Sequence, residues 1–209
     1  MLRLSPPFLL CVRRLLYLRG NGIINCDIPR PLCYYITFSH LLFHHGLNMR
    51  ALIIGYGNTY CHDDGVALVV INELRRRHGI RELQPDEDGL DDLGHEIDSI
   101  MLHQLVPEVV PVAAHYPCVV FVDAHVGSIP EDVRVIRVQE EYRFHAVTHH
   151  MGPGMLLSMA RETTGLAPSG YLVSIRGENF DFGLGLSDSC RLRVDGAVQN
   201  ILGLIKETV

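Results

Sequence analysis

The sequence predicts an α/β fold: a single three-layer domain with a mostly parallel, twisted sheet and helices on both faces, over about 160 residues from Met49 onward. Two observations predict it. Short continuous apolar runs recur along the chain, as in strands that are buried on both faces. Segments with helical apolar spacing separate these runs, so neighbouring parallel strands are expected to be joined by right-handed crossovers.

The first unit of this pattern is a strand, a turn and a helix. Ala51–Ile54 is a continuous apolar run, and Gly55 and Gly57 follow it where the backbone must turn sharply. Gly65–His78 then has apolar residues at helical spacing and arginines near its end, where positive charge suits the negative pole of a helix.

The second unit begins after a long acidic stretch. Residues 80–95 are polar, acidic and glycine-bearing, which predicts a solvated loop. Glu96–Leu102 is expected to be a strand. Pro107 is well placed to open a helix that runs to about Ala114, because proline is favoured in the first helical turn.

The central strand is expected at Val119–Val122, a continuous apolar run between Pro117 and Asp123. Asp123 therefore falls at the carboxyl end of this strand, the end at which open parallel sheets bind ligands. Val133–Val138 alternates between apolar and polar residues, as an edge or half-exposed strand does.

The remaining elements complete the alternation. We expect a helix over Met155–Thr163, a buried strand over Tyr171–Ile175 and an amphipathic helix over Ser187–Lys206. A glycine-rich loop, Phe180–Leu186, precedes this last helix.

The composition is that of an ordinary globular chain, with 47% apolar and 20% charged residues. The net charge of −6 argues against nucleic acid or an anionic membrane as a partner. Six cysteines without a CxxC pair argue against a zinc ribbon or a disulfide framework and suit a reducing, cytoplasmic location.

Residues 1–48 differ from the rest, with five arginines, no lysine and Asp27 as their single acidic residue. Arginines interrupt the apolar run at Phe8–Leu18, which argues against a signal peptide or a membrane span. We expect a poorly structured leader over 1–48, with translation starting at Met49, and the folded functional domain over 49–209. A targeting or partner-binding arm is the alternative.

Three polar features are expected at one edge of the sheet. Asp63 and Asp64 follow the first strand, Asp123 ends the central strand, and His149 and His150 precede a helix. Two carboxylates and an imidazole can bind a borderline divalent cation such as nickel or zinc, or serve acid–base chemistry. Structural interpretations remain open: a helix cap for an aspartate of the pair, a turn residue for Asp123, and a solvated or structural role for one histidine.

Other sites are less well supported. Gly55 and Gly57 suggest a dinucleotide turn, but Tyr60 stands where the third glycine is needed, and only Asp98 could serve as the acidic ribose partner. Cys61 lacks an evident base, and the chain has no GxSxG elbow. The remaining histidines His62, His103, His125 and His145 are expected to be surface or core residues.

Taken together, the motifs resemble those of the hydrogenase maturation endopeptidases, from Met49 to near the C-terminus. They are Gly55-x-Gly57-Asn58, Asp63-Asp64-Gly65-Val66, Asp123-Ala124 after a strand, and Thr148-His149 ahead of Pro153. Gln104-Leu105-x-Pro107-Glu108 resembles the branch that serves soluble, cofactor-reducing hydrogenases. The leader, the acidic stretch and Ala67, where many members have glycine, depart from the family pattern.

The resemblance implies that Asp64, Asp123 and His149 contact a metal ion. His149 is preferred to His150 because it lies four residues before Pro153. The resemblance also implies that this metal is nickel and that it is held by the substrate, the precursor of a hydrogenase large subunit. Zinc or cadmium is expected to take its place in vitro. Asp64 and Asp123 are also the candidate catalytic residues, although a metal-polarised water is an equally consistent nucleophile.

Three further residues are expected to contact the substrate: Asn58, Asp63 and Gln104. Asn58 has the alternative role of tying the turn together. Asp63 has the alternative roles of capping the helix and organising the loop, which leaves Asp64 as the ligand.

The implied function is removal of a C-terminal extension from the nickel-loaded large-subunit precursor of a NiFe hydrogenase, by a cytoplasmic monomer that needs neither nucleic acid nor a membrane. The alternatives are a nickel-dependent checkpoint or chaperone that does not cut, a peptidase for another metalloprotein, and a small nucleotide-binding domain.

Overall fold

The computed structural model describes residues 16–19, 22–25, 51–127, 129–141, 151–165 and 168–208. Contacts divide the chain into two compact units, Met1–Gly46 and Leu47–Val209. In the first unit, β1 (Leu16–Arg19) pairs with β2 (Gly22–Asn25) in antiparallel fashion. Apart from these two strands, the prediction of a poorly structured leader falls outside the described residues.

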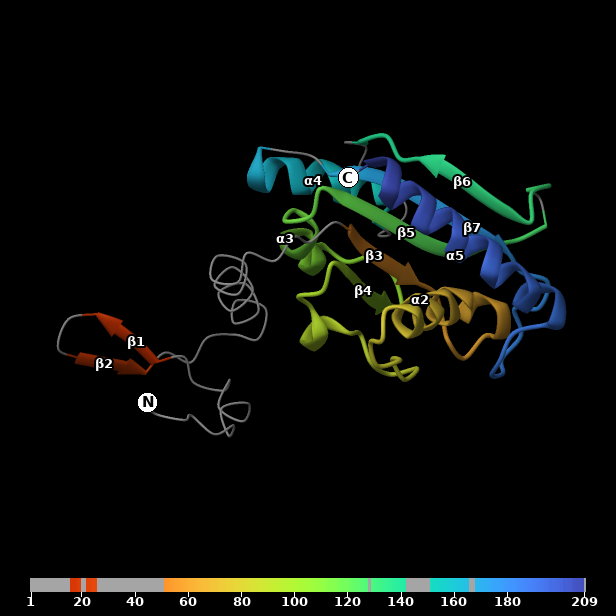
Figure 1. Ribbon diagram of the computed structural model, residues 1–209, viewed down its shortest axis with the longest axis horizontal. Helices are drawn as coiled ribbons and strands as arrows, with labels where there is room; N and C mark the ends of the chain where they lie inside the picture. Colours follow the sequence, from red (N-terminus) through yellow and green to blue (C-terminus); the bar gives the residue numbers. More distant parts are fainter. Residues whose placement is uncertain are drawn as a thin grey trace. The chain divides into compact units, whose positions relative to one another are not determined.

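The second unit is built on one five-stranded sheet, in which β6 alone is antiparallel to its neighbour (Figure 1). This confirms the mostly parallel sheet. The strands, in their order across the sheet, are β4 (Ile97–Leu102), β3 (Ala51–Tyr56), β5 (Cys118–His125), β7 (Ser169–Arg176) and β6 (Val133–Arg137).

The burial of each strand matches its sequence. In β3 the run Ala51–Ile54, and in β5 the run Val119–Val122, have 0% exposure, because helices cover both faces of the central strands. In β6 the alternating segment Val133–Arg137 is largely exposed, which confirms the predicted edge strand.

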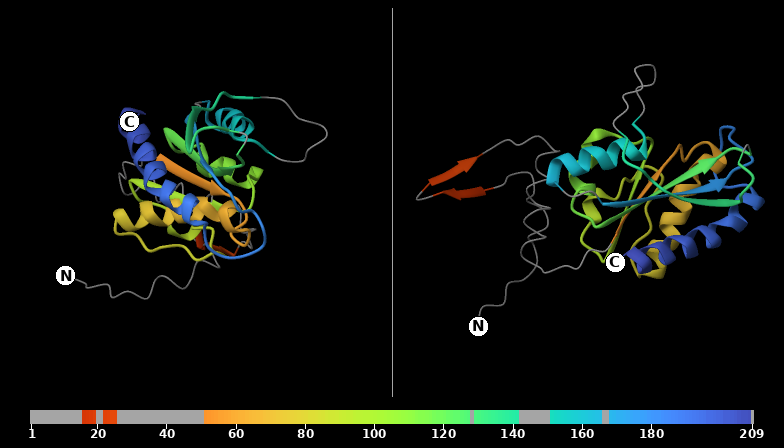
Figure 2. Two further views of the ribbon diagram at one scale, coloured as in Figure 1. Left: turned by 90° about the vertical axis from the view of Figure 1, so that its right-hand side faces the viewer. Right: turned by 90° about the horizontal axis from the view of Figure 1, so that it is seen from above.

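Helices cover both faces of the sheet, so the expected three layers are confirmed. Figure 2 shows α2 (Val66–Arg77) and α5 (Asp188–Thr208) on one face and α4 (Pro153–Thr164) on the other. The short α3 (Val110–Ala113) packs against α4. None of the helices in the described ranges is long and apolar enough to cross a membrane.

Two predicted helices differ in detail. The helix expected over Pro107–Ala114 is a 3₁₀ turn, η3 (Pro107–Val109), followed by α3. α4 begins at Pro153, two residues earlier than expected, with proline in its first turn.

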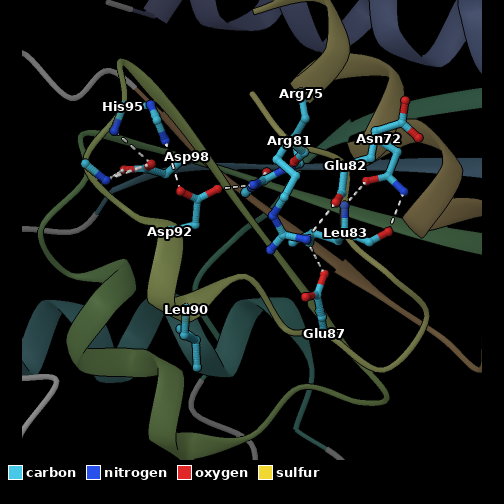
Figure 3. A network of polar contacts seen from close by, with 12 residues as sticks. Asn72, Arg75, Arg81, Glu82, Leu83, Glu87, Leu90, Asp92, His95 and Asp98 are labelled. Carbon is cyan, nitrogen blue, oxygen red and sulfur yellow. Dashed lines mark hydrogen bonds and ion pairs between the residues drawn. The ribbon is translucent and has the colours of Figure 1, made fainter. Parts of the chain in front are cut away.

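The acidic stretch is attached to α2 and is not the fully solvated loop that its composition predicts. Leu83 is 2% exposed, and its backbone exchanges two hydrogen bonds with the Asn72 side chain, at 2.8 and 2.9 Å (Figure 3). The 3₁₀ turn η2 (Leu90–Asp92) carries Asp92, which pairs with the buried guanidinium of Arg75. Asp92 is therefore neutralised by an arginine of the adjacent helix.

The Asp98 carboxylate is bound by groups of the protein, so it is not free to bind the ribose of a dinucleotide, the role considered for it from the sequence. Its carboxylate is 1% exposed, accepts hydrogen bonds from the backbone of Gly94 and His95, and accepts another from the Tyr116 hydroxyl at 2.7 Å. Burial raises the pKa of Asp98 despite these hydrogen bonds. Asp98 therefore holds the segment before β4 in place.

Candidate active site

The sheet order creates a site at the carboxyl ends of β3 and β5. The chain passes from β3 to β4 on one side and then returns to place β5 on the other side of β3. In open parallel sheets, ligands bind where the strand order reverses in this way. The loop after β3 and the last residues of β5, which contain Asp64 and Asp123, lie at this place.

The loop after β3 closes on itself through Gly57 and Asn58. Gly57 has φ of +138°, and a Cβ on it would lie 2.2 Å from the backbone oxygen of Asp64, so only glycine fits. The backbone amide of Asn58 donates a hydrogen bond to Oδ2 of Asp64 at 2.6 Å. The Asn58 side chain donates to the sulfur of Cys61 and accepts from the backbone amide of Tyr60. Asn58 therefore ties the turn together, and Gly57 is explained without a phosphate ligand.

Asp63 joins this loop to the segment after β7. Its side chain is fully buried and accepts four hydrogen bonds: from the amides of Glu178, Asn179 and Ser187 and from the Ser187 hydroxyl, at 2.7–3.0 Å. Burial opposes the charged form, but the hydrogen bonds outweigh it and lower the pKa of Asp63. Asp63 thus organises two loops that are far apart in the sequence.

The prediction that an aspartate caps the helix is wrong. The 3₁₀ turn η1 (His62–Gly65) precedes α2, Gly65 is the N-cap of α2, and neither helix start has a side-chain cap. The reason is that both carboxylates are used elsewhere: Asp63 by the segment after β7, and Asp64 by the Asn58 amide.

Asp123 lies within the last residues of β5 on the face covered by α3 and α4. Val120 and Val122 pack in the core with α2 and α5, so strand alternation directs Asp123 to the opposite face. Its Oδ1 accepts the Ala124 amide at 2.8 Å, and the Tyr56 hydroxyl hydrogen-bonds to its carboxylate.

The environment of Asp123 makes it a proton acceptor near neutral pH. Burial and, to a lesser extent, the nearby charge of Asp64 raise its pKa to about 6, while the hydrogen bonds from Tyr56 and Ala124 act in the opposite direction. The pKa of Tyr56 is itself raised by burial and by Asp123, so this phenol keeps its proton.

The two predicted catalytic carboxylates therefore converge. Asp64 comes from the loop after β3 and Asp123 from β5, and their charges interact. Two carboxylates with different environments can divide the work of charge stabilisation and proton transfer, and their oxygens can also bind a divalent cation.

The third predicted ligand, His149, lies outside the described residues, as does His150. Among the residues that the structure does describe, no group of three His, Cys, Asp or Glu side chains is placed to hold a metal ion. The described flanks of the His149 segment meet each other, because the Glu141 amide donates to the Gly154 oxygen at 3.1 Å. Gly154 is in α4, on the face of the sheet that carries Asp123.

The other predicted residues have clear positions. Gln104 is exposed in the bend after β4, beside the carboxyl end of β3. His62 is half-buried against Gly183, His103 is exposed, and His125 is 8% exposed with Nε2 3.0 Å from the Glu131 oxygen. His145 lies outside the described residues.

Tyr56 is a site residue that the sequence analysis missed. It is the last residue of β3, and the register pairs the preceding Gly55 with Val122, which places Tyr56 beside Asp123. The sequence does show that β3 and β5 each end in polar residues. Only the strand order, which makes β3 and β5 neighbours, shows that Tyr56 and Asp123 meet.

Solved structures with this fold include hydrogenase maturation proteases. The hydrogenase maturating endopeptidase HybD from E. coli matches at a TM-score of 0.54 and 20% identity, over 76% of this chain and 93% of that one. The [NiFe] hydrogenase maturation protease HybD from Thermococcus kodakarensis matches at 0.50 and 20%, over 75% and 99%. HycI from the same organism, also a [NiFe] hydrogenase maturation protease, matches at 0.50 and 21%, over 81% and 99%.

No protein-family model matches the chain, and no curated protein does. At about 20% identity, the structural likeness shows the fold: this chain has the α/β fold of HybD and HycI.

Proposed function

We propose that this protein is an endopeptidase that removes a C-terminal extension from the nickel-loaded large-subunit precursor of a NiFe hydrogenase. The observation that carries the proposal is the pair Asp64 and Asp123 at the carboxyl ends of neighbouring strands, in a fold shared with hydrogenase maturation proteases. The motif resemblance around the same residues supports it.

The nickel belongs to the substrate in this proposal. Asp64 and Asp123 supply hard oxygen ligands, and His149 supplies a nitrogen ligand, so that a precursor carrying nickel binds productively and an empty one does not. Zinc or cadmium in the precursor is expected to support binding in vitro.

Asp123 is the proposed general base. The Ala124 amide and the Tyr56 hydroxyl orient its carboxylate beside Asp64, where the oxygen that does not bind nickel can accept a proton from the attacking water. The water oxygen bonds to the peptide carbonyl carbon, the C–N bond breaks, and the proton passes from Asp123 to the leaving nitrogen. Asn58 and Gln104 are proposed to lie along the substrate, with Asp63 holding the loop that carries Asp64.

We further propose that the protein acts as a cytoplasmic monomer, without nucleic acid or a membrane. The net charge of −6 supports the absence of nucleic-acid and membrane partners, because it disfavours binding to anionic polymers and surfaces. The three cysteines within the described ranges, Cys61, Cys118 and Cys190, are free thiols, as expected in a reducing compartment.

The test is incubation of the protein with nickel-loaded and nickel-free precursor, followed by mass spectrometry of the large subunit. We expect a single loss of mass at the C-terminus of the nickel-loaded precursor only. Asp64→Asn, Asp123→Asn and His149→Ala are each expected to abolish this loss while leaving thermal unfolding cooperative. Asp91→Asn, a change of an exposed carboxylate in η2, is the matched control.

The outcomes separate the alternatives. Nickel-dependent binding without loss of mass would establish a checkpoint or chaperone. Cleavage of another nickel or zinc protein, with the hydrogenase precursor left intact, would establish a different substrate. Processing by His149→Ala at the wild-type rate would overturn recognition through the proposed three ligands.

A further inference from the structure

Large apolar side chains are exposed on two loops beside the candidate active site. Phe182 is 87% exposed, Leu184 67%, Tyr60 49% and Phe180 37%. We call these four residues the apolar patch. Tyr60 belongs to the loop after β3, and the other three belong to the glycine-rich segment after β7. Grouped exposed apolar residues on a globular protein commonly mark a binding surface.

The two loops that carry the apolar patch lie side by side. The Gly183 amide donates to the Tyr60 oxygen at 2.8 Å, and the His62 amide donates to the Gly183 oxygen at 3.0 Å. A Cβ on Gly183 would lie 2.1 Å from Nε2 of His62, so the His62 ring packs directly on Gly183 and a larger residue there would displace it. The patch is therefore formed by two segments that are distant in the sequence and adjacent in the fold.

The same loops are fixed from beneath by buried polar contacts. Asp63 binds both ends of the segment, at Glu178 and Asn179 on one side and at Ser187 on the other. His62 adds a contact of 2.9 Å between its Nδ1 and the Gly185 oxygen. The buried Asp63 carboxylate and the His62 contact thus hold a loop whose apolar side chains lie in solvent, where they lose the stabilisation that burial would provide. This arrangement favours a preformed surface for a partner.

The position of the patch identifies the partner. Tyr60 is in the same short loop as Asp64, which is tied to Asn58, so a partner seated on the patch contacts the loop that carries Asp64. A second copy of the chain seated there would obstruct the approach to Asp64. A polypeptide substrate that runs from the patch to Asp64 would instead contact the patch and the candidate catalytic residue at the same time.

We propose that the apolar patch docks an apolar segment of the precursor protein next to the bond that is cut; this inference rests on the proposed function. Phe182 and Leu184 provide most of the exposed surface and are the expected anchors. Docking here acts on binding and not on the chemical step, because the anchors Phe182 and Leu184 lie in the segment after β7, which carries neither Asp64 nor Asp123.

The experiment compares wild type with a Phe182→Ser, Leu184→Ser double variant in steady-state cleavage of the nickel-loaded precursor. We expect KM to rise about tenfold or more while kcat changes less than about twofold. Ile136→Ser is the matched control, because Ile136 is a 39% exposed apolar residue on β6, paired with Leu172 in the middle of β7. It is expected to keep the wild-type KM. Thermal unfolding of all three proteins checks their folding.

The results distinguish the inference from the proposed function. Cleavage by the double variant with the wild-type KM would overturn docking at the patch and leave the endopeptidase intact. If wild type does not cleave, the endopeptidase proposal fails, and calorimetric titration with precursor then decides: weaker binding by the double variant supports docking, and equal binding overturns it. If wild type is a dimer in solution and the double variant is a monomer, the patch serves self-association and the inference is overturned.

Discussion

Three aspartates near the site have three different environments. Asp63 is fully buried and its four hydrogen bonds lower its pKa, so it stays charged and structural. Asp64 is half-buried and tied to the Asn58 amide. Asp123 has a raised pKa because burial dominates over its two hydrogen bonds. Hydrogen-bond number and burial therefore give Asp63 a structural role and support Asp123 as the proposed proton acceptor.

The raised pKa of Asp123 predicts a pH-dependent stability difference. Between its ordinary value of 3.8 and its folded value of about 6, the folded state holds a proton that the unfolded state lacks. Its contribution to stability is therefore full below the ordinary value and lost as pH rises through 6. Relative to wild type, Asp123→Asn should gain up to about 3 kcal/mol in unfolding free energy from pH 4 to pH 7.5. Urea unfolding across this range measures it, and a pH-independent difference would contradict it.

Tyr56 is predicted to tune this carboxylate. Its hydrogen bond lowers the pKa of Asp123, so Tyr56→Phe should shift the acid limb of the kcat/KM profile to higher pH. Tyr116→Phe is a matched control, since it also removes a buried tyrosine–aspartate hydrogen bond, but to Asp98. The control should leave the limb in place. Equal acid limbs in wild type and Tyr56→Phe would argue against Asp123 as the base.

At the scale of elements, the loop after β3 and the segment after β7 behave as one structure. Asp63 provides the link, and the backbone pairing of Tyr60, His62 and Gly183 continues it. The loop that carries Asp64 therefore depends on hydrogen bonds made to residues more than a hundred positions away in the sequence.

Asp63→Asn should destabilise the protein by about 2–4 kcal/mol, because an amide cannot accept all the donors that surround a buried carboxylate. Ser187→Ala removes one of these donors and should cost only about 1 kcal/mol. Since the pKa of Asp63 is lowered on folding, its contribution is present above the ordinary value of 3.8 and is lost as pH falls through the folded value. Denaturant unfolding at pH 7 and pH 2.5 tests both points; equal losses for the two variants would be inconsistent with this role.

At the scale of the whole molecule, the five-stranded sheet, the helices that cover it and the core lie within one compact unit, Leu47–Val209, and Met1–Gly46 forms another. The two central strands, β3 and β5, are covered on both faces by helices of the same unit.

We therefore predict that a chain of residues 49–209 keeps the fold and the activity. Its midpoint of thermal unfolding should lie within about 2 °C of the full chain, because no core residue of the sheet is removed. Its rate of precursor cleavage should equal that of the full chain. Calorimetry and the mass assay check this, and loss of cooperative unfolding in the shorter chain would show that the first unit contributes to the core.

Much of the fold could be predicted from local patterns. The strands at Ala51–Ile54 and Val119–Val122 were evident from apolar runs, and the edge strand from its alternation at Val133–Val138. The prediction that the acidic stretch is a fully solvated loop was wrong, because composition does not reveal that Arg75 is buried and pairs with Asp92. The predicted helix cap was wrong for a similar reason: Asp63 has partners on a distant segment.

Local sequence patterns thus established the order of strands and helices and the candidate carboxylates, since apolar periodicity and turn residues act over a few positions. The metal-contacting role of Asp64, Asp123 and His149 remains a prediction from the motifs. Strand order was needed to bring Asp64 and Asp123 together, to place Tyr56 against Asp123 and to hold the segment after β7 beside the loop that carries Asp64. These are long-range contacts that arise when the sheet assembles and water is excluded, and the raised pKa of Asp123 is a consequence of that burial.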